Sequence, residues 1–242
     1  MSEELIYDGL QRCPYLPGQV ARMPLYRQLR RLTLEETDAR FAMAERRVGN
    51  ALYSTRCPTC RACEGLRIPV ERHRLTKSQR RTRNRAAKAI TVEAGRVSFS
   101  EEKLDLFLRH KAQRGLSSDD ELSVMCERSY TQWLIHSCMM TMEMRYYFEG
   151  RLVGVGVLDV GARSMSSVYF YFDPSPEISK LSLGTYSVLC EIDMARKTGR
   201  DHLYLGLYVE DCRHLVYKGS FYPHERLVGG TWLGMEKPES ST

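Results

Sequence analysis

The spacing of apolar residues predicts helices in the first part of the chain. Apolar positions recur three and four residues apart in three segments, 33–46, 101–114 and 118–140. The last segment begins with Asp119, Asp120 and Glu121, which the positive N-terminal end of a helix favours. Another helix should begin at Thr76, because Thr76 and Gln79 have the spacing of a capping box.

From residue 144 onward the pattern changes to that of strands. Short runs rich in aromatic and β-branched residues are separated by turn residues such as Glu149-Gly150. The expected elements are strands over 144–148, 152–160 and 166–172, a helix over 184–198 closed by Gly199, a strand over 202–208 and a short helix over 211–217. An antiparallel meander that feeds a β-α-β unit predicts the α+β class.

Composition and charge favour a globular protein. Hydrophobic residues make up 43% and charged residues 27% of the 242 residues. No segment approaches the roughly 20 apolar residues of a membrane span, and the acidic N-terminus lacks the pattern of a secretory signal. We therefore expect a cytoplasmic protein. The expected divisions are a Cys-containing N-terminal lobe over 1–75, a basic helix and connection over 76–94, a larger domain over 95–235 and a disordered tail over 236–242.

Four cysteines form a candidate metal site. Cys57, Cys60 and Cys63 lie within seven residues, and Cys13 is the nearest candidate for a fourth ligand. Four thiolates suit tetrahedral zinc or an iron–sulfur cluster. The alternative is a group of thiols around a tight turn, and it stays open because a second Cys-x-x-Cys pair is absent: position 16 is Leu16.

A basic segment is the strongest charge asymmetry of the chain. Eight Lys or Arg residues and no acid lie between Arg72 and Lys88. On the helix expected there, Lys77, Arg81 and Arg85 share one face. Such a face is typical of a contact with the phosphate backbone of a nucleic acid, and charge alone does not choose between RNA and DNA. A solvated cationic face is the alternative.

Two further segments carry groups suited to acyl transfer. The strand that contains Tyr169 ends at Asp173-Pro174, and a loop then leads to Gly184 at the start of a helix. Free amides at such a helix start could hold an anion or an ester carbonyl. The glycine-rich loop that binds coenzyme A in N-acetyltransferases is missing. Farther on, Lys218 lies beside a glycine and could present a cation to a cleft.

The chain resembles the N-end-rule aminoacyl-tRNA–protein transferases, which include bacterial aspartate/glutamate leucyltransferases and eukaryotic arginyl-tRNA–protein transferases. The resemblance rests on Cys13-Pro-Tyr-Leu-Pro-Gly, Cys57-Pro-Thr-Cys60-Arg-Ala-Cys63, Lys77-Ser-Gln-Arg-Arg, the segment from Ser167 to Pro174, Ser182-Leu-Gly184-Thr185-Tyr186 and Tyr217-Lys218-Gly. It implies an acyl-CoA N-acyltransferase-like (GNAT-like) C-terminal domain with a smaller Cys-containing lobe. Its implied substrates are Leu-tRNA or Arg-tRNA and proteins that begin with Asp or Glu, which are thereby marked for degradation, with neither DNA nor a membrane as a partner.

The reaction that this resemblance implies needs no cofactor, because the ester of an aminoacyl-tRNA is already activated. Positioning is then the main task. We expect the tRNA to be bound by Lys77, Arg80, Arg81 and Arg85. Lys218 should pair with the acidic acceptor residue, helped by Tyr208 or Tyr217. Tyr169 and Asp173 should orient the amine, and the amides near Gly184 and Thr185 should bind the ester carbonyl. The alternatives are a coenzyme A-dependent N-acetyltransferase and a non-enzymatic, zinc-containing nucleic-acid-binding protein.

Overall fold

A mixed sheet of eight strands runs through most of the chain. The computed structural model describes residues 3–113 and 124–237. In the order β14-β13-β7-β12-β11-β10-β9-β8, all neighbours are antiparallel except β11 and β12, which are parallel. The strands are β7 Glu64–Pro69, β8 Ile90–Arg96, β9 Met140–Phe148, β10 Arg151–Val160, β11 Ser164–Phe172, β12 His202–Tyr208, β13 His224–Val228 and β14 Thr231–Met235. The expected meander and β-α-β unit are confirmed.

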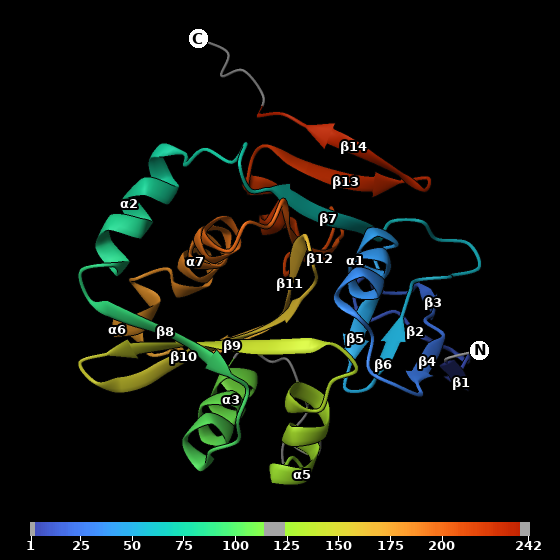
Figure 1. Cartoon of the computed structure of the whole chain (residues 1–242), viewed down its shortest axis with the longest axis horizontal. Helices are drawn as coiled ribbons and strands as arrows, with labels where there is room; N and C mark the ends of the chain where they lie inside the picture. Colours follow the sequence, from blue (N-terminus) through green and yellow to red (C-terminus); the bar gives the residue numbers. More distant parts are fainter. Residues whose placement is uncertain (1–2, 114–123, 238–242) are drawn as a thin grey trace.

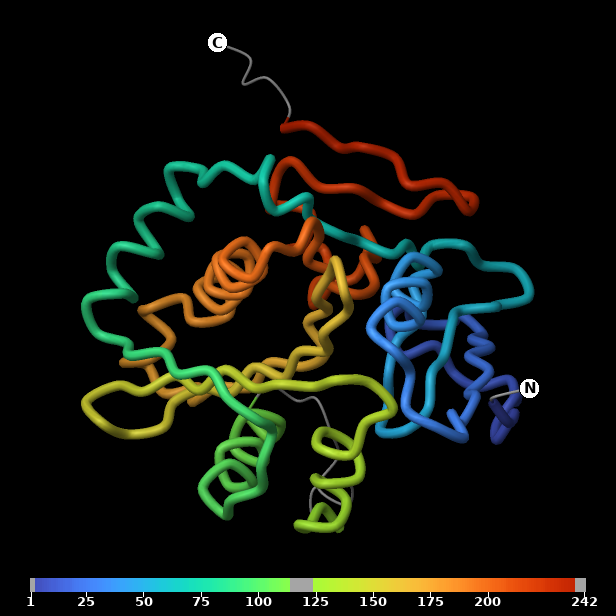
Figure 2. Tube along the Cα trace, in the orientation of Figure 1, coloured from blue at the N-terminus to red at the C-terminus, as the bar shows by residue number. Residues whose placement is uncertain are grey.

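A smaller lobe is formed by the N-terminal residues. It contains a four-stranded sheet of order β1-β4-β6-β5, a two-stranded β2-β3 pair and one helix. The bounds are β1 Glu3–Tyr7, β2 Leu10–Arg12, β3 Val20–Arg22, β4 Leu25–Gln28, α1 Leu34–Ala42, β5 Arg46–Val48 and β6 Ala51–Tyr53. Figure 2 shows the chain leaving this lobe and entering the large sheet as β7. The strands β7 and β8 both belong to the large sheet, although the expected boundaries at residues 75 and 95 place them outside the larger domain.

Helices cover both faces of the large sheet. In Figure 1, α2, α6 and α7 lie on one face, and α3 and α5 lie on the other. The helical elements are α2 Lys77–Ala86, α3 Glu101–Gln113, α5 Glu127–Tyr130, the π-helical turn η1 Thr131–Ile135, α6 Pro176–Ser179, α7 Leu183–Lys197 and the 3-10 turn η2 Val216–Ser220. Each face has its own apolar core, one centred on α7 and the other on α3.

Local capping explains where two helices begin. The Thr76 hydroxyl accepts from the Gln79 amide at 3.2 Å, and the Gln79 side chain accepts from the Thr76 amide at 3.0 Å. Thr33 and Glu36 form the same reciprocal pair at the start of α1. The capping box expected at Thr76 is confirmed. Gly199, expected after α7, has the left-handed backbone (φ +70°) that favours glycine.

Three expected helices differ from the structure. The helix of 33–46 ends at Ala42, because the chain turns there and Arg46 begins β5. Of the helix expected over 118–140, only residues 127–135 are helical in the described part; β9 begins at Met140, and residues 114–123, with the acidic start, lie outside the described residues. The helix of 211–217 is replaced by turns followed by the short η2. In the tail expected over 236–242, residues 238–242 likewise lie outside the described part.

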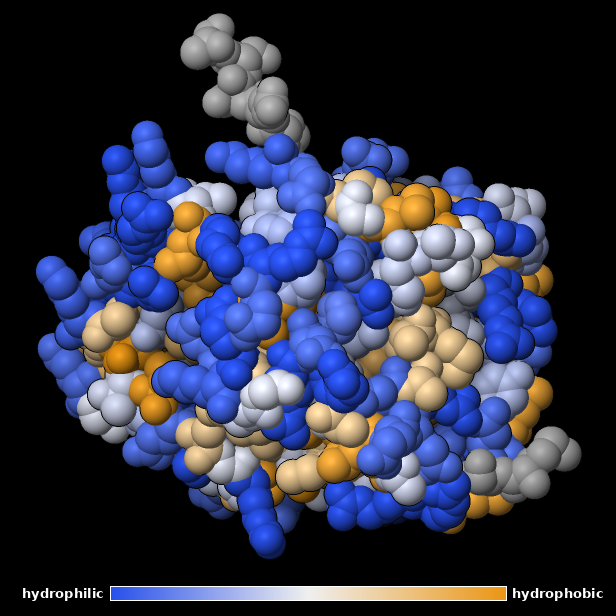
Figure 3. All heavy atoms as spheres, turned by 45° about the horizontal axis from the view of Figure 1, so that its top comes forward, coloured by the Kyte–Doolittle hydropathy of each residue, from blue (hydrophilic) through white to orange (hydrophobic). Residues whose placement is uncertain are grey.

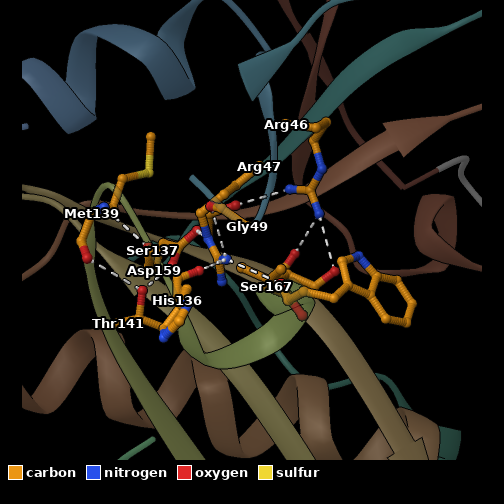
Figure 4. Close-up of polar contacts among 12 residues, drawn as sticks. Arg46, Arg47, Gly49, His136, Ser137, Met139, Thr141, Asp159 and Ser167 are labelled. Atoms are coloured by element: carbon orange, nitrogen blue, oxygen red, sulfur yellow. Dashed lines mark hydrogen bonds and ion pairs between the residues drawn. The ribbon is translucent and has the colours of Figure 1, made fainter. Parts of the chain in front are cut away.

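The small lobe is joined to the large sheet by a buried ion pair. Arg47 of β5 donates to the Asp159 carboxylate of β10 at 2.7 Å, and both side chains are 1% exposed. Figure 4 shows the Arg47 guanidinium surrounded by Asp159 and by the carbonyls of Gly49 and His136. Thr141 donates to the same carboxylate at 2.6 Å. These contacts fix β5 against the sheet.

Within the described residues, no helix is long and apolar enough to cross a membrane.

Candidate active site

A cavity opens where two parallel strands separate. β11 and β12 are paired only from Ser164–His202 to Ser166–Tyr204, although both strands continue beyond this point. The space beyond the last pair is a cavity of about 780 Å³, lined by residues of β11, β12, the start of α7 and the segment around η2. The small lobe contributes Tyr15, Arg46, Arg47, Val48 and Tyr53 to its wall. The cavity therefore lies between the lobe and the sheet.

A β-bulge in β11 shapes one wall of this cavity. Tyr169 pairs with Val157 and Ser167 pairs with Leu158, so Val168 is the extra residue. A bulge frees carbonyls from the strand ladder and changes the direction of side chains. Arg46 donates from Nη2 to the carbonyls of Ser167 (2.8 Å) and Val168 (3.3 Å). Figure 4 shows Arg46 reaching from the small lobe to this wall.

Gly206 makes room for this arginine. Its φ is +79°, and a Cβ at this position would lie 2.6 Å from Arg46 Cζ. A side chain there would thus be strained and would also displace the guanidinium. The glycine in Tyr204-Leu-Gly206-Leu-Tyr208 is thus required by a contact with Arg46, a residue 160 positions earlier in the chain.

Lys218 lies in the same cavity with a perturbed amino group. Its Nζ donates to the Leu207 carbonyl at 2.7 Å, while part of the side chain stays accessible. Desolvation, reinforced by the nearby Arg46 charge, lowers the pKa of Lys218 to about 7. An entering carboxylate would reverse this effect, because an opposite charge favours the ammonium form. Tyr217 lines the cavity next to it.

The N-terminus of α7 contributes to the cavity wall. Gly184 and Thr185 both line the cavity. The Thr185 amide donates to the Ser182 carbonyl at 3.0 Å, so this amide is already used. No backbone hydrogen bond to another described residue engages the Gly184 amide, which leaves it as the better candidate for binding an oxygen atom.

Aromatic and aliphatic side chains form another part of the cavity wall. Tyr169 lies with its ring centroid 5.1 Å from Trp133 and 5.8 Å from Phe107. Trp133, Leu134, Phe170 and Val188 also line the space. This side of the cavity suits an apolar side chain.

Two residues expected in the site lie outside its lining. Asp173 is 3% exposed, and its carboxylate is paired with Arg151 and, at 3.4 Å, with Arg109. Hydrogen bonds from Ser175 and Arg151 outweigh desolvation and lower the pKa of Asp173 to about 2. Asp173 thus holds the end of β11 instead of facing a substrate amine. Tyr208 is buried beneath Arg226, whose guanidinium lies 5.0 Å from the ring centroid.

The charges around the cavity have one sign. Among the described residues, its lining contains the cations Arg46, Arg47, Arg213 and Lys218 and no Asp or Glu. The Arg47 charge is paired with Asp159, whereas Arg46 and Arg213 have no carboxylate partner among the described residues, and Lys218 adds a partial positive charge at neutral pH. The cavity is therefore complementary to an anionic substrate group beside an apolar one. Arg46 and Arg213 had not been predicted, because a single arginine has no distinctive local pattern.

The basic helix α2 contacts a residue of the cavity lining through Arg85. Lys77, Arg80, Arg81 and Arg85 are all exposed, whereas Gln79, Thr82 and Ala86 face the core. None of the four cations is ion-paired to a carboxylate in the described part of the chain. Figure 3 shows a largely hydrophilic surface around α2. Arg85 donates to the Ser182 hydroxyl at 3.1 Å, and Ser182 lines the cavity, so the basic face continues to its edge.

The four predicted metal ligands come near one another in the small lobe. Burial, with additional effects of Cys57, Cys13 and Cys60, raises the pKa of Cys63 to about 12. Cys13 Sγ accepts from the amides of Tyr15 and Leu16, both at 3.4 Å. Nevertheless, no three His, Cys, Asp or Glu side chains of the described residues are arranged to hold one metal ion. The metal site stays a prediction.

Comparison with known proteins connects this geometry with a family. Residues 11–81 match the family model for the N-terminus of arginine-tRNA-protein transferases, and residues 102–228 match the model for the C-terminus. An aspartate/glutamate leucyltransferase of Aeromonas hydrophila is 32% identical, over 99% of this chain and 100% of its own length. A protein with the same name in Chromohalobacter salexigens is 33% identical, over 91% of this chain and 88% of its own length.

A solved structure supports the fold. It is the C-terminal domain of a putative lysylphosphatidylglycerol synthetase from Agrobacterium fabrum, with a TM-score of 0.51, 13% identity, and coverage of 72% of this chain and 58% of that chain. The predicted α+β class with a GNAT-like domain is confirmed. The chain belongs to the arginine-tRNA-protein transferase family and is an aminoacyltransferase.

Proposed function

We propose that this protein transfers leucine from Leu-tRNA to proteins that begin with Asp or Glu, in the cytoplasm, where charged tRNA is available. The observation that carries the proposal is the cavity lining, which combines several cations with an apolar wall and, among the described residues, has no carboxylate. The cations suit the acidic acceptor, and the apolar wall suits a leucyl side chain. An arginyl side chain would find no partner there and would be repelled. The names of the relatives support the same substrates.

The chemistry requires positioning more than activation. The amine nitrogen of the acceptor attacks the carbonyl carbon of the aminoacyl ester, a C–N bond forms, and the C–O bond to the ribose breaks. The amine must be neutral, and an α-amino group with a pKa of about 8 supplies a useful neutral fraction. In our proposal the Gly184 amide donates to the carbonyl oxygen as negative charge develops there.

Lys218 is proposed to bind the acceptor's side-chain carboxylate, with Tyr217 beside it. Because its pKa is lowered to about 7, the free enzyme carries only part of this charge at neutral pH. Binding of the carboxylate should complete the protonation. Transfer needs no cofactor in this scheme. The four cysteines remain candidates for a zinc or iron–sulfur site, and no step of the reaction uses them.

The exposed face of α2 is proposed to bind the tRNA backbone. Exchanging Arg81 and Arg85 for glutamate should weaken tRNA binding at least about tenfold and reduce the slope of log affinity against log salt by about 2, because each lost phosphate contact removes counterion release. Filter binding over a range of salt concentrations measures both effects. The control is Arg12→Glu with Arg128→Glu, which changes the net charge equally but lies away from α2. Equal losses in the two double variants would remove this role.

The substrates are tested by transfer from radiolabelled Leu-tRNA and Arg-tRNA to peptides that start with Asp, Glu, Lys or Ala. We expect product from Leu-tRNA with the Asp and Glu peptides, and at least about tenfold less from Arg-tRNA, since an unpaired charge costs more than about 1.4 kcal/mol. A preference for Arg-tRNA would contradict the leucine assignment. Absence of product from both tRNAs would overturn the proposal.

A further inference from the structure

A buried carboxyl group lies directly behind the cavity wall. Glu191 of α7 is 1% exposed. The Ser167 hydroxyl donates to its Oε1 at 3.4 Å, and its Oε2 has no hydrogen-bond partner among the described residues. The titratable groups that face it are Tyr146 of β9 and Cys190 of α7, whose pKa values are both raised by burial. No cation of the described chain offsets its charge.

Stability does not explain this residue. A buried carboxyl group with one long hydrogen bond and one unpartnered oxygen is costly compared with an amide or an apolar side chain. Groups of this kind occur preferentially at functional sites. Glu191 also lies one helical turn beyond Ser187, which lines the cavity.

Ser167 connects Glu191 to the cavity. Ser167 is part of the cavity lining, and its carbonyl is held by Arg46 at 2.8 Å. The adjacent bulge at Val168 fixes its backbone. Because its hydroxyl donates to Glu191, the oxygen lone pairs of this hydroxyl remain available to accept from a substrate amine.

We propose that Ser167 and Glu191 form a proton relay for the transfer reaction, an inference that rests on the function proposed above. Ser167 contacts the attacking amine, and Glu191 is a positioning residue that acts through it and receives the proton. As the amine nitrogen bonds to the ester carbon, its proton moves to Ser167 Oγ while the Ser167 proton moves to Glu191 Oε1. When the C–O bond breaks, the same path returns a proton to the ribose oxygen, so both residues recover their initial state.

The acidity of Glu191 suits this exchange. Desolvation raises the pKa of Glu191 to about 8, despite the opposing hydrogen bond from Ser167. This value is close to that of an α-amino group, about 8, so the carboxyl can both accept and return a proton without a large energy difference. The 3.4 Å contact is long for a hydrogen bond, and such catalytic contacts commonly shorten when substrate binds.

The relay is tested in the full chain with Glu191→Gln, Ser167→Ala and the double variant, using Leu-tRNA and a peptide that starts with Asp. Each single variant should lower kcat about 100-fold, with KM for both substrates within about twofold of wild type. The double variant should be no slower than the slower single variant, because the two residues act as one unit. Glu177→Gln, an exposed residue of α6, is the matched control and should keep wild-type kcat.

Two further measurements separate a relay from a structural role. With an aminooxy acceptor, whose nucleophile stays neutral from about pH 6 to about pH 9, wild-type kcat should fall below about pH 8 and the Glu191→Gln profile should be flat. The pKa of Glu191 is raised in the folded state, from an ordinary value of 4.5 to about 8. The protein therefore loses stability as the pH rises through this range, because the unfolded state releases the proton first. Glu191→Gln removes this loss and should raise the unfolding midpoint at pH 8. Wild-type kcat in Glu191→Gln, or an unchanged pH profile, overturns the relay. A wild-type protein without transfer activity overturns the proposed function instead.

Discussion

Replacing Lys218 with alanine should lower kcat/KM for transfer to a peptide that starts with Asp about 100-fold or more. The proposed ion pair lies in a partly desolvated cavity, where removing one charge leaves the substrate carboxylate without its partner, a loss of about 2–5 kcal/mol. Binding of Leu-tRNA should stay within about twofold of wild type. Steady-state transfer assays and filter binding measure the two quantities.

The matched control is Lys197→Ala, which removes an exposed lysine of α7 and should change neither quantity. The pH dependence gives a second check. Since the pKa of Lys218 is lowered to about 7, KM for the acceptor should rise as pH rises above this value, and the rise should disappear in Lys218→Ala. Unchanged transfer by the variant would remove Lys218 from the acceptor site.

Replacing Asp159 with alanine should lower the free energy of unfolding by about 3–5 kcal/mol. The Arg47 guanidinium would remain buried without its counterion, because both side chains of the pair are 1% exposed. Thr141 would lose the closer of its two hydrogen-bond acceptors at the same time. Urea unfolding followed by circular dichroism measures the change.

The control for this variant is Asp8→Ala. Its partner, Arg22, lies 2.6 Å away, but the two side chains are 40% and 26% exposed, so we expect a loss of no more than about 1 kcal/mol. If Asp159→Ala were as stable as Asp8→Ala, the buried pair would not be what holds the small lobe against the sheet.

Part of the candidate site could be recognised from local motifs. Tyr169, Gly184, Thr185 and Lys218 come from three separate segments, and the structure brings all of them to one cavity. Asp173 was misplaced for a physical reason. An Asp-Pro pair after a strand resembles a catalytic carboxylate, whereas here Arg109 and Arg151, both distant in the chain, neutralise it.

Long-range contacts determine the backbone conformation of the segment around residue 138. Its apolar pattern is compatible with a helix, but the Cys138 carbonyl accepts from the Leu32 amide at 2.7 Å, and the Met139 carbonyl accepts from Arg31 at 3.0 Å. These partners lie more than 100 residues earlier. Periodicity within a window cannot reveal them.

The sequence by itself determined the elements whose stabilising atoms are close neighbours along the chain. The capping box of Thr76 and Gln79, the turn at Glu149-Gly150 and the helix end at Gly199 each depend on a few adjacent residues. The same holds for the basic face of α2, which follows from helical spacing alone.

Only the tertiary structure decided how these elements make a site. The insertion of β7 between β13 and β12, the separation of β11 from β12, and the approach of Arg46 to Gly206 and Lys218 join residues far apart in the chain. Their energies arise from desolvation, charge and close packing in the folded state. None of these leaves a periodic pattern in the sequence, because each depends on surroundings that exist only after folding.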